Sequence, residues 1–369
     1  MKILHFSSAK TWRGGEQQIA YLYEELHKQQ IQQWIFCAKG GALARYCQRQ
    51  NIPHFTYQKR FSINPLVAYQ FKKLSKELKI DLAHLHDSHS HTYGYISAIL
   101  GNSIPFVLSR RVDFPVKDNW LSYQKYNHPS IKKILSVSNY VQRILAPAIK
   151  DQSKLQVVHS GVDTTRFKYT KQHILRKAYN ILDKTKIIAN VAAIAPHKDY
   201  FTFVDTAAIL LKKPNENRYQ FLIIGADGGE AEQIKRYIQE KGLSKQIILT
   251  GFRKDIPQIL PEVDVFLFTS KEEGLGTSVI DALACGIPIV ATKAGGIPEI
   301  IQDGKNGFLA PIKNAAQLAE KVEQLLLNPM TRKQFVENGK TTVLQFSKES
   351  TARKTLVVYE KIIQQASTQ

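Results

Sequence analysis

The sequence predicts an α/β protein made of two doubly wound domains, each built on a parallel sheet that helices cover on both faces. Short, continuously apolar runs of strand length alternate with amphipathic stretches, which is typical of strands buried on both sides in a parallel sheet. This alternation occurs twice, once on either side of a polar and charged stretch at 166–183. A chain of 369 residues is long enough for two such domains, and we expect their boundary at 165–185.

Each apolar run is expected to be a strand, because a short run without polar positions has no side that faces solvent. These runs lie at 2–7, 33–38, 82–86, 106–109, 134–138 and 155–159, and then at 187–194, 220–224, 246–250, 263–269 and 287–292. Helices are expected at 16–29, 67–79, 92–101, 200–212, 230–241, 277–285 and 315–327. The segment 346–365 predicts a further amphipathic helix, since Leu356, Tyr359 and Ile363 are spaced to share one face.

Composition excludes several classes of protein. Hydrophobic residues make up 43% of the chain and charged residues 22%, which argues against a disordered chain. The apolar runs are too short to span a bilayer, and the first residues lack the apolar core and cleavage site of a signal peptide. Cys37, Cys47 and Cys285 have no CxxC spacing, so we expect reduced thiols, no zinc site and a cytoplasmic protein.

Charge is distributed unevenly along the chain. Lys and Arg number 51 against 31 acidic residues, a net charge of +20. Residues 1–170 hold 24 basic and 10 acidic residues and the remainder holds 27 and 21, so the excess lies mainly in the N-terminal half. Such a surface predicts an anionic partner: a nucleic acid, an anionic membrane or a phosphorylated substrate. The alternative is an ordinary solvated, lysine-rich surface.

The strongest functional signal is the segment SKEEGLGTSVIDALACGIPIVATKAGGIP at 270–298. It follows an apolar strand, and glycines such as Gly276 would let the backbone approach a ligand closely before a helix begins near Thr277. Free amides at the start of a helix favour an anion such as a phosphate. Glu273 and Asp281 can both accept hydrogen bonds from one polyhydroxylated ligand such as a sugar. The alternative is structural: a loop glutamate, and an aspartate stabilised by the helix dipole.

The same segment resembles the signature EGxG…EAxAxGxPVVA…GGxPE of the family 4 (group 1) retaining glycosyltransferases. The resemblance implies the GT-B fold, in which two Rossmann-like domains face each other across a cleft and a C-terminal helix crosses back to the N-terminal domain. It implies that Glu273 contacts hydroxyls of the donor sugar. Asp281 stands where a second glutamate is usual and, with a shorter reach, would contact the nucleotide ribose. The backbone amides of Leu275, Gly276 and Thr277 would lie near the donor's phosphates or sugar.

The resemblance extends over most of the chain. KILHFSSAKTWRGGEQQIAYLYEEL, at 2–26, is similar to the family's first strand, glycine-rich turn and first helix, which implies that amides at Gly14 and Gly15 reach the donor diphosphate. NVAAIAPHKDY resembles the first strand of the C-terminal domain and places Lys198 at the family's phosphate-binding lysine. The family's arginine five residues earlier is replaced by Ala193, so one of the usual two diphosphate cations is absent.

Two more segments match the family. TGFRKDIPQIL, at 250–260, resembles the loop along the nucleotide base, which makes Arg253 and Lys254 candidate donor contacts; the alternative is a pair of exposed loop cations. FSKESTARKTLVVYEKII matches the helix that crosses back. The expected domains are therefore an acceptor-binding domain, 1–168 with 346–369, and a nucleotide-sugar-binding domain, 169–345.

Where the family often has a histidine after its fourth N-terminal strand, this chain has Arg110, Arg111 and Asp113. The role of the family's histidine therefore cannot be assigned to a histidine of this chain. We expect these three residues to contact the acceptor or the sugar.

Histidines occur just upstream, in HLHDSHSH at 84–91. We expect Asp87 and His89 to hydrogen-bond acceptor or donor hydroxyls from a loop at the end of a strand. A metal site is one alternative, because imidazole and carboxylate are common ligands. His84 and His86 alternate along a strand, however, and the family does not require a metal, so no metal site is expected. Ordinary structural histidines are another alternative.

The predicted function is transfer of a sugar from a nucleotide-diphosphate-sugar donor to a glycan or glycolipid acceptor, with retention, in lipopolysaccharide or other cell-surface polysaccharide biosynthesis. Glu273, Lys198, Asp87 and His89 are the catalytic candidates. No cofactor is expected to be required, since the nucleotide sugar is a co-substrate. The alternatives are a nucleotide-sugar-binding protein without turnover and a GT-B nucleotide-sugar 2-epimerase. A nucleic-acid-binding protein is not favoured, because no helix-turn-helix, RNP or zinc-finger pattern occurs.

The acceptor is expected to be anionic and membrane-borne, which places the protein in the cytoplasm and peripherally on the inner face of the cell membrane. The segment 57–79 mixes aromatic and aliphatic residues with lysines and Arg60, as an interfacial helix would. The alternative is an ordinary surface helix.

Overall fold

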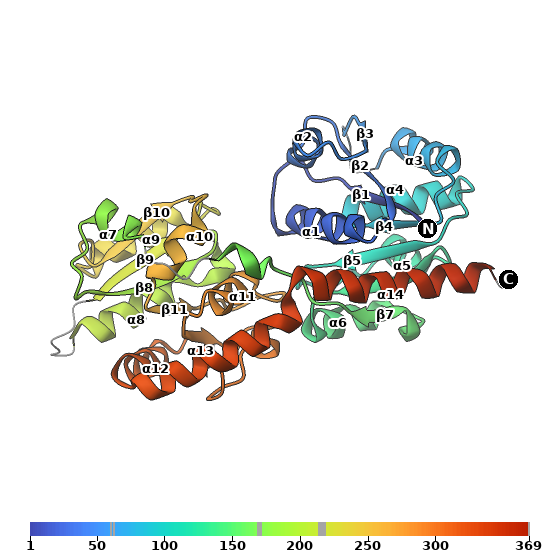
Figure 1. The fold of residues 1–369 in the computed structure, drawn as a ribbon. Helices are drawn as coiled ribbons and strands as arrows, with labels where there is room; N and C mark the ends of the chain where they lie inside the picture. Colours follow the sequence, from blue (N-terminus) through green and yellow to red (C-terminus); the bar gives the residue numbers. More distant parts are fainter. Residues whose placement is uncertain (60, 62, 168–171, 213–218, 368–369) are drawn as a thin grey trace. The chain divides into compact units, whose positions relative to one another are not determined.

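The computed structural model describes residues 1–59, 61, 63–167, 172–212 and 219–367, which form two compact units (Figure 1). Unit 1 consists of Met1–Gly161 and Lys348–Gln369, and unit 2 of Val162–Ser347. Each unit contains one sheet in which every neighbouring pair of strands is parallel. Two doubly wound α/β domains, as the sequence predicts, are therefore confirmed.

The sheet of unit 1 has the strand order β3-β2-β1-β4-β5-β6-β7. Its strands are β1 (Lys2–Ser7), β2 (Gln32–Ala38), β3 (His54–Tyr57), β4 (Leu82–Leu85), β5 (Phe106–Arg110), β6 (Ile131–Ser136) and β7 (Leu155–Val157). The order reverses between β1 and β4, so the loops that follow these two strands lie side by side at the carboxyl edge. Such a reversal is where open α/β sheets bind ligands.

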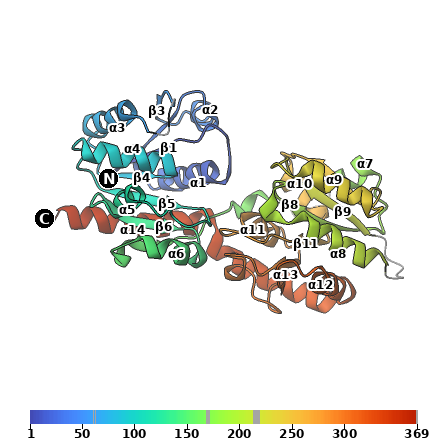
Figure 2. The same cartoon turned by 180° about the vertical axis from the view of Figure 1, so that it is seen from behind.

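Successive residues of the β1 strand point to opposite faces of the unit 1 sheet, and each face has its own core. On one face Ile3 belongs to a cluster with residues of α1 (Gly14–Lys28) and α14 (Lys348–Ser367), among them Leu22 and Tyr359. On the other face Leu4 packs with residues of α3 (Pro65–Glu77), α4 (Ser88–Ile99) and α5 (Trp120–Asn127). Figures 1 and 2 show α14, drawn in red, running along unit 1. The expected return of the C-terminal helix to the N-terminal domain is thus confirmed.

The sheet of unit 2 has the order β10-β9-β8-β11-β12-β13. Its strands are β8 (Lys186–Val191), β9 (Tyr219–Ile224), β10 (Ile247–Gly251), β11 (Val265–Phe268), β12 (Ile289–Thr292) and β13 (Phe308–Ala310). Its helices include α8 (Tyr200–Lys212), α9 (Ala231–Glu240), α11 (Thr277–Ala284), α12 (Ala315–Leu327) and α13 (Pro329–Val343). All four residues of β11 are buried, which shows that both faces of the sheet are covered.

Several elements, most of them short, were not anticipated from the sequence. They are β3 and β13 among the strands, and α2 (Ala42–Arg49), α5, α6 (Asn139–Leu145), α7 (Ile174–Tyr179), α10 (Ile256–Ile259) and α13 among the helices. The β3 strand is an edge strand with two exposed residues, and β13 has only three residues. Neither is long enough to show a hydrophobic period, so local pattern alone did not reveal them.

The first crossing between the units falls after Gly161 and the second after Ser347, rather than after residues 168 and 345. The cause is a short pairing within unit 2. The Val162 amide donates to the Phe346 carbonyl at 2.9 Å, and Val162 also forms a parallel bridge with Ser347. Part of the expected boundary, 168–171, lies outside the described residues.

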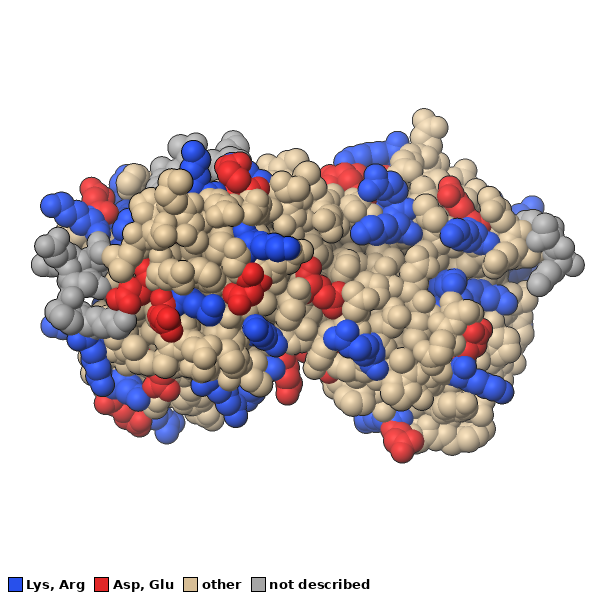
Figure 3. Space-filling view, turned by 90° about the horizontal axis from the view of Figure 1, so that it is seen from below, with Lys and Arg blue, Asp and Glu red and all other residues tan. Residues whose placement is uncertain are grey.

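The charge asymmetry persists when the chain is divided at these crossings. Unit 1 has 26 basic and 11 acidic residues, whereas unit 2 has 25 and 20. Figure 3 shows that the basic side chains on the visible face of unit 1 are spread among uncharged ones rather than gathered in one place. Among the described residues, no helix is long and apolar enough to cross a membrane.

Candidate active site

The Glu273 loop of unit 2 is held by close backbone packing. It connects the carboxyl end of β11 to the start of α11. The Gly296 amide donates to the Glu273 carbonyl at 2.9 Å. A Cβ atom at Gly295 would lie 1.9 Å from that same carbonyl oxygen, and one at Gly296 would lie 2.5 Å from the Gly274 carbonyl oxygen. The two glycines of the AGGIP segment are therefore needed, because a side chain at either position would clash with the Glu273 loop.

Lys198 and Glu273, both predicted to be catalytic, are brought together by the structure. The Lys198 ammonium donates a hydrogen bond to the Glu273 carboxylate. The two side chains are only 13% and 15% exposed, and the Lys198 ammonium lies 5.2 Å from the centre of the Phe268 ring. A lysine held in this partly dry setting is a fixed positive charge next to a fixed hydrogen-bond acceptor, which suits a ligand carrying both phosphates and hydroxyls.

Hydrogen bonds from a backbone amide and a hydroxyl group fix the two loops that carry Lys198 and Glu273 to each other. Lys198 ends the short 3₁₀ helix η4 (Pro196–Lys198) that follows β8. The Lys271 amide donates to the His197 carbonyl at 2.9 Å, and the Thr269 hydroxyl donates to the Lys198 carbonyl at 3.1 Å. The ends of the neighbouring strands β8 and β11 thus set the position of both charged groups.

The start of α11 has the geometry that the motif predicts. Gly276 is the N-cap residue, with φ +96°, a conformation that favours glycine. A Cβ atom there would also lie 2.5 Å from Ile297 Cδ1. Leu275 is buried, so only its backbone can contact a ligand, whereas Thr277 is exposed. The free backbone N–H groups at this helix start can donate hydrogen bonds to an anion.

Asp281 lies one turn into α11 and faces a residue that sequence reasoning missed. Arg166, at the end of η3 (Thr164–Arg166), places its guanidinium 3.8 Å from the Asp281 carboxylate. Burial raises the pKa of Asp281 to about 6, and the nearby Asp163 adds to this rise while Arg166 opposes it. Arg166 precedes the α11 motif by more than a hundred residues, so no local pattern in the sequence links it to Asp281.

The other two donor candidates in unit 2 differ from each other. Arg253 donates a bidentate pair of hydrogen bonds to the Asp255 carboxylate, from Nε at 2.8 Å and from Nη2 at 2.5 Å. A carboxylate two residues away thus holds its guanidinium. Lys254 is exposed. Among the described residues, neither side chain forms a hydrogen bond or an ion pair with Lys198 or Glu273.

Gly14 and Gly15 of unit 1 open the α1 helix just beyond the carboxyl end of β1. A Cβ atom at either position would have no described atom within 4 Å. The backbone at this turn therefore lies beside open space and can be approached closely. Glu16, the next residue, is buried, and its carboxylate accepts a hydrogen bond from the Arg13 amide at 3.0 Å. Burial raises the pKa of its carboxyl group. Sequence reasoning did not single out Glu16.

Asp87 mainly holds two loops together. Its carboxylate caps the start of α4 by accepting the amides of His89 at 3.0 Å and Ser90 at 2.9 Å. It also accepts the Ser8 amide at 2.5 Å and the Ser8 hydroxyl at 2.6 Å. It therefore fixes the loop after β1 to the loop after β4. The pKa of the half-buried His89 ring is lowered, chiefly by burial and then by Lys59, which keeps the ring neutral at pH 7.

Arg110 and Arg111 point to opposite faces of the unit 1 sheet. Arg110 is buried and donates to the Tyr126 hydroxyl at 3.1 Å and to the Phe114 carbonyl. Arg111 donates to the His86 carbonyl at 3.1 Å and lies 3.4 Å from His86 Nδ1. Burial lowers the pKa of Arg111 to about 10, so it remains a cation. Asp113 is half-buried in the loop that follows.

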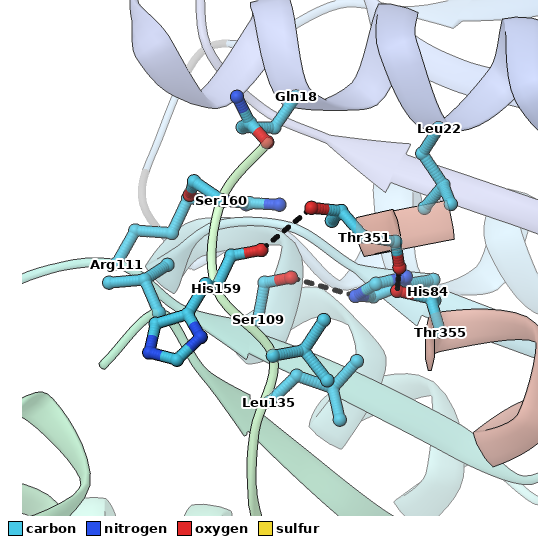
Figure 4. A pocket seen from close by; sticks show the side chains of 12 residues that line it. Gln18, Leu22, His84, Ser109, Arg111, Leu135, His159, Ser160, Thr351 and Thr355 are labelled. Carbon is cyan, nitrogen blue, oxygen red and sulfur yellow. Dashed lines mark hydrogen bonds between the residues drawn. The ribbon is translucent and has the colours of Figure 1, made fainter. Parts of the chain in front are cut away.

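Arg111 lines a small hollow in unit 1. Figure 4 shows Gln18 entering from α1, Thr351 and Thr355 from α14, and His84 and Ser109 from the sheet. The Thr351 hydroxyl donates to the His159 carbonyl at 2.8 Å, and Gln18 bonds both the amide and the carbonyl of Gly161. Two helices thus anchor the chain segment that leaves unit 1.

Three buried histidines, His5, His84 and His86, lie close together, and His84 also lines this hollow. Their ligand atoms are within 4.8 Å of one another, close enough for a metal. Each ring nitrogen already has a partner, however: Gln33, Tyr359, Ser109, Arg111, or another of the three histidines. Burial lowers the pKa of all three. The contacts favour a neutral hydrogen-bonded network, and His5 is a member that the HLHDSHSH segment did not reveal.

Two family descriptions match the chain, in the order of its units. Glycosyltransferase Family 4 matches residues 12–166, and Glycosyl transferases group 1 matches residues 171–342. An uncharacterized glycosyltransferase of Methanocaldococcus jannaschii is 30% identical over 323 residues, which is 85% of this chain and 84% of that protein.

A second relative is N,N'-diacetylbacillosaminyl-diphospho-undecaprenol alpha-1,3-N-acetylgalactosaminyltransferase of Campylobacter jejuni. It is 27% identical over 326 residues, which is 82% of this chain and 84% of that protein. Among solved structures, Anabaena HepE in complex with UDP and glucose superposes with a TM-score of 0.85 at 20% identity and covers 98% of this chain and 100% of that one.

Proposed function

The chain belongs to the group 1, or family 4, glycosyltransferases and has their GT-B fold, and on this premise we propose that it moves a sugar from a nucleoside-diphosphate sugar to a glycan or glycolipid acceptor with retention of the anomeric configuration. The observation that carries the proposal is the contact between Lys198 and Glu273 beside the start of α11. A cation, a carboxylate and free helix amides lie together there, which is what a diphosphate joined to a sugar requires.

Unit 2 supplies the groups for departure of the donor diphosphate. Negative charge grows on the leaving oxygen as the sugar becomes oxocarbenium-like. The Lys198 ammonium and the amides of Leu275, Gly276 and Thr277 would stabilise that oxygen. Glu273 would hold sugar hydroxyls, so that the acceptor oxygen bonds to the anomeric carbon on the face that the diphosphate leaves. Asp281 would contact the ribose, and Arg253 and Lys254 the base.

Unit 1, which consists of Met1–Gly161 and Lys348–Gln369, supplies the acceptor side in this proposal. The open turn at Gly14 and Gly15 would bring amides to the diphosphate. His89, Arg111 and Asp113 would meet the acceptor or the sugar. Asp87 would act chiefly through the loops it ties together, and Arg110 would act through Phe114 and the α5 helix, because their polar atoms already bond those elements.

The acceptor class is proposed from the relatives. The Campylobacter enzyme is named for an acceptor carried on diphospho-undecaprenol, and the Anabaena structure holds UDP and glucose. Unit 1 carries a net charge of +15. A lipid- or glycan-borne anionic acceptor in cell-surface or lipopolysaccharide synthesis, met at the inner face of the membrane, fits these facts. The nucleotide sugar would be a co-substrate, and the residues at the site would work without a metal.

The test is an assay of sugar transfer by Lys198→Ala and Glu273→Ala. Lys235→Ala, an exposed lysine on α9, is the matched control. Both site variants should lose activity by about 100-fold or more, and the control should keep it. Undiminished turnover by both site variants would reject the assignment. Proton NMR of the product tests retention, and donor binding without release of the nucleoside diphosphate would indicate a binding protein.

A further inference from the structure

Four polar side chains of unit 1 form a continuous row of hydrogen bonds, which we call the histidine row: Gln33, His5, His86 and Arg111. Gln33 Oε1 lies 3.0 Å from His5 Nε2, and His5 Nδ1 lies 3.0 Å from His86 Nε2. His86 Nδ1 then lies 3.4 Å from Arg111 Nη2. The first three residues are buried and Arg111 is half-buried. The row begins on β2, crosses β1 and the end of β4, and finishes just after β5, so it leads from the interior to the carboxyl edge of the sheet.

The Gln33 end of the row fixes the direction of its hydrogen bonds. The Gln33 side-chain nitrogen donates to the Tyr23 carbonyl of α1 at 3.2 Å, so the Gln33 oxygen faces His5 and can only accept. His5 Nε2 therefore carries a hydrogen. A neutral imidazole has one donor nitrogen and one acceptor nitrogen, which makes His5 Nδ1 an acceptor. His86 Nε2 must donate to it.

Both rings are neutral in the folded chain, as this direction requires. Burial lowers the pKa of His5 to about 4, and burial together with His84 and Arg111 lowers the pKa of His86 well below its usual value. His86 Nδ1 is then an acceptor, and it faces a guanidinium that can only donate. The direction set at Tyr23 thus reaches Arg111 without placing two hydrogens or two lone pairs against each other.

Arg111 is held by His86 at two points. Its Nη1 donates to the His86 carbonyl at 3.1 Å, and its Nη2 faces the His86 ring. A guanidinium has five N–H groups. In the described part of the chain both hydrogen bonds of Arg111 go to His86, so its other N–H groups remain available to a ligand at the hollow that Arg111 lines (Figure 4). Two bonds to one residue fix the plane in which those groups point.

The His86 ring is itself supported by His84. The two rings stack with their centres 4.0 Å apart and their planes at 29°. His84 Nδ1 lies 2.5 Å from the Tyr359 hydroxyl of α14, and its Nε2 lies 2.8 Å from the Ser109 hydroxyl. The C-terminal helix therefore helps to fix the ring that contacts Arg111.

We propose that the three buried members of the histidine row are positioning residues for Arg111, and that they orient its guanidinium toward oxygen atoms of the acceptor or the sugar. The inference rests on the proposed function, in which Arg111 meets one of these ligands. It gives a role to Gln33, which is separated from Arg111 by two rings and contacts no ligand itself. Removing Gln33 frees His5 to adopt the other tautomer, and that change would pass along the row.

The first test is nitrogen-15 NMR of the histidine rings in the full chain at pH 7, without donor or acceptor. Spectra of His5→Gln and His86→Gln assign the two signals. Both rings should be neutral and carry their hydrogen on Nε2, and Gln33→Met should abolish this single form of His5. A hydrogen on Nδ1 of either ring, or a protonated ring, would overturn the proposal. One equivalent of bound zinc that is lost in His86→Gln would also overturn it.

The second test is a double-mutant cycle of Gln33→Met and Arg111→Ala. Asn102→Leu is the control, because it also removes a buried amide of unit 1, one that bonds Ser97 instead. Gln33→Met should lower kcat/KM about tenfold in the wild type but less than about twofold in Arg111→Ala, and the control should leave kcat/KM unchanged. An equal loss in both backgrounds, or no loss in either, would contradict a role that acts through Arg111.

Failure of the proposed function can be distinguished from failure of the histidine row. The tautomers and the melting temperatures of the same variants need no turnover. Gln33→Met should lower the melting temperature of the wild type by more than that of Arg111→Ala, since the two residues belong to one network. A chain with these properties that transfers no sugar would refute the function alone, whereas equal shifts in the two backgrounds would overturn the row.

Discussion

The Lys198 ammonium contacts the Glu273 carboxylate although 75 positions separate the two residues in the sequence. The contact joins the loops after the neighbouring strands β8 and β11. We expect each charged group to have two roles. It stabilises the other group in the folded protein, and it contacts the donor when the donor is bound. These two roles can be separated by substitution.

Lys198→Met and Glu273→Gln should each lower the free energy of unfolding, because each leaves a largely buried polar partner without its counter-charge. The double variant should recover most of the stability, since neither charge is then left alone. Activity should not recover: kcat should stay about 100-fold or more below wild type in all three. Thermal melts and turnover of the same preparations give both values. An active double variant would show that the pair is only structural.

Gly295→Ala should damage the site by displacing the Glu273 loop. Its Cβ atom would lie 1.9 Å from the Glu273 carbonyl oxygen, and the residue has φ +51°. Gly304→Ala is the control, because Gly304 has φ +75° but no described atom within 4 Å of the added carbon. Both changes should cost about 1 kcal/mol through the backbone conformation, whereas only Gly295→Ala should also abolish activity. Equal activity in the two variants would contradict the packing described for this loop.

Gly15→Ala tests the open turn at the start of α1. An added Cβ atom would meet no described atom within 4 Å, and alanine favours the helical conformation. We therefore expect unchanged or slightly higher stability. If the donor diphosphate approaches this backbone, the methyl group should raise KM for the donor. Steady-state kinetics on a variant that melts normally decides the point, and an unaltered KM would remove Gly15 from the donor site.

Asp281 should make stability depend on pH in a definite direction. Its pKa is about 6 in the folded chain against an ordinary value of 3.8, so the folded state holds more protons than the unfolded state between these values. The free energy of unfolding should therefore fall as the pH rises from 4 to 6. Asp281→Asn removes this cost and should stabilise the chain at pH 7.5 by up to about 3 kcal/mol, and at pH 4 by less than about 1 kcal/mol.

Urea denaturation of the wild type and of Asp281→Asn at the two pH values provides the measurement. A variant that is less stable than the wild type at pH 7.5 would mean that the contact with Arg166 outweighs the burial of the carboxylate.

Sequence pattern was sufficient where a feature is local or repeated. The alternation of apolar runs and amphipathic stretches predicted both sheets, because a strand that is buried on both faces consists of a continuous run of apolar residues. The EGLG…GIP motif placed Glu273, Gly276 and the start of α11 together, since all of them lie within one strand–loop–helix unit. The helix expected at 315–327 has those bounds in the structure.

Sequence pattern failed where a contact joins distant segments. Nothing near Asp281 indicates that Arg166 faces it, and nothing near His86 indicates that His5 completes a hydrogen-bonded row with it. The different roles of Arg110 and Arg111 follow from the alternation of a strand, but only the packed sheet shows that one meets Tyr126 and the other His86.

The most direct test of the central claim is calorimetric titration of the wild type and Lys198→Ala with a panel of uridine, guanosine and adenosine diphosphate sugars. The account predicts saturable binding of at least one donor by the wild type and at least about tenfold weaker binding by the variant. A wild-type chain that binds none of them, or a variant that binds the preferred donor equally well, would contradict it.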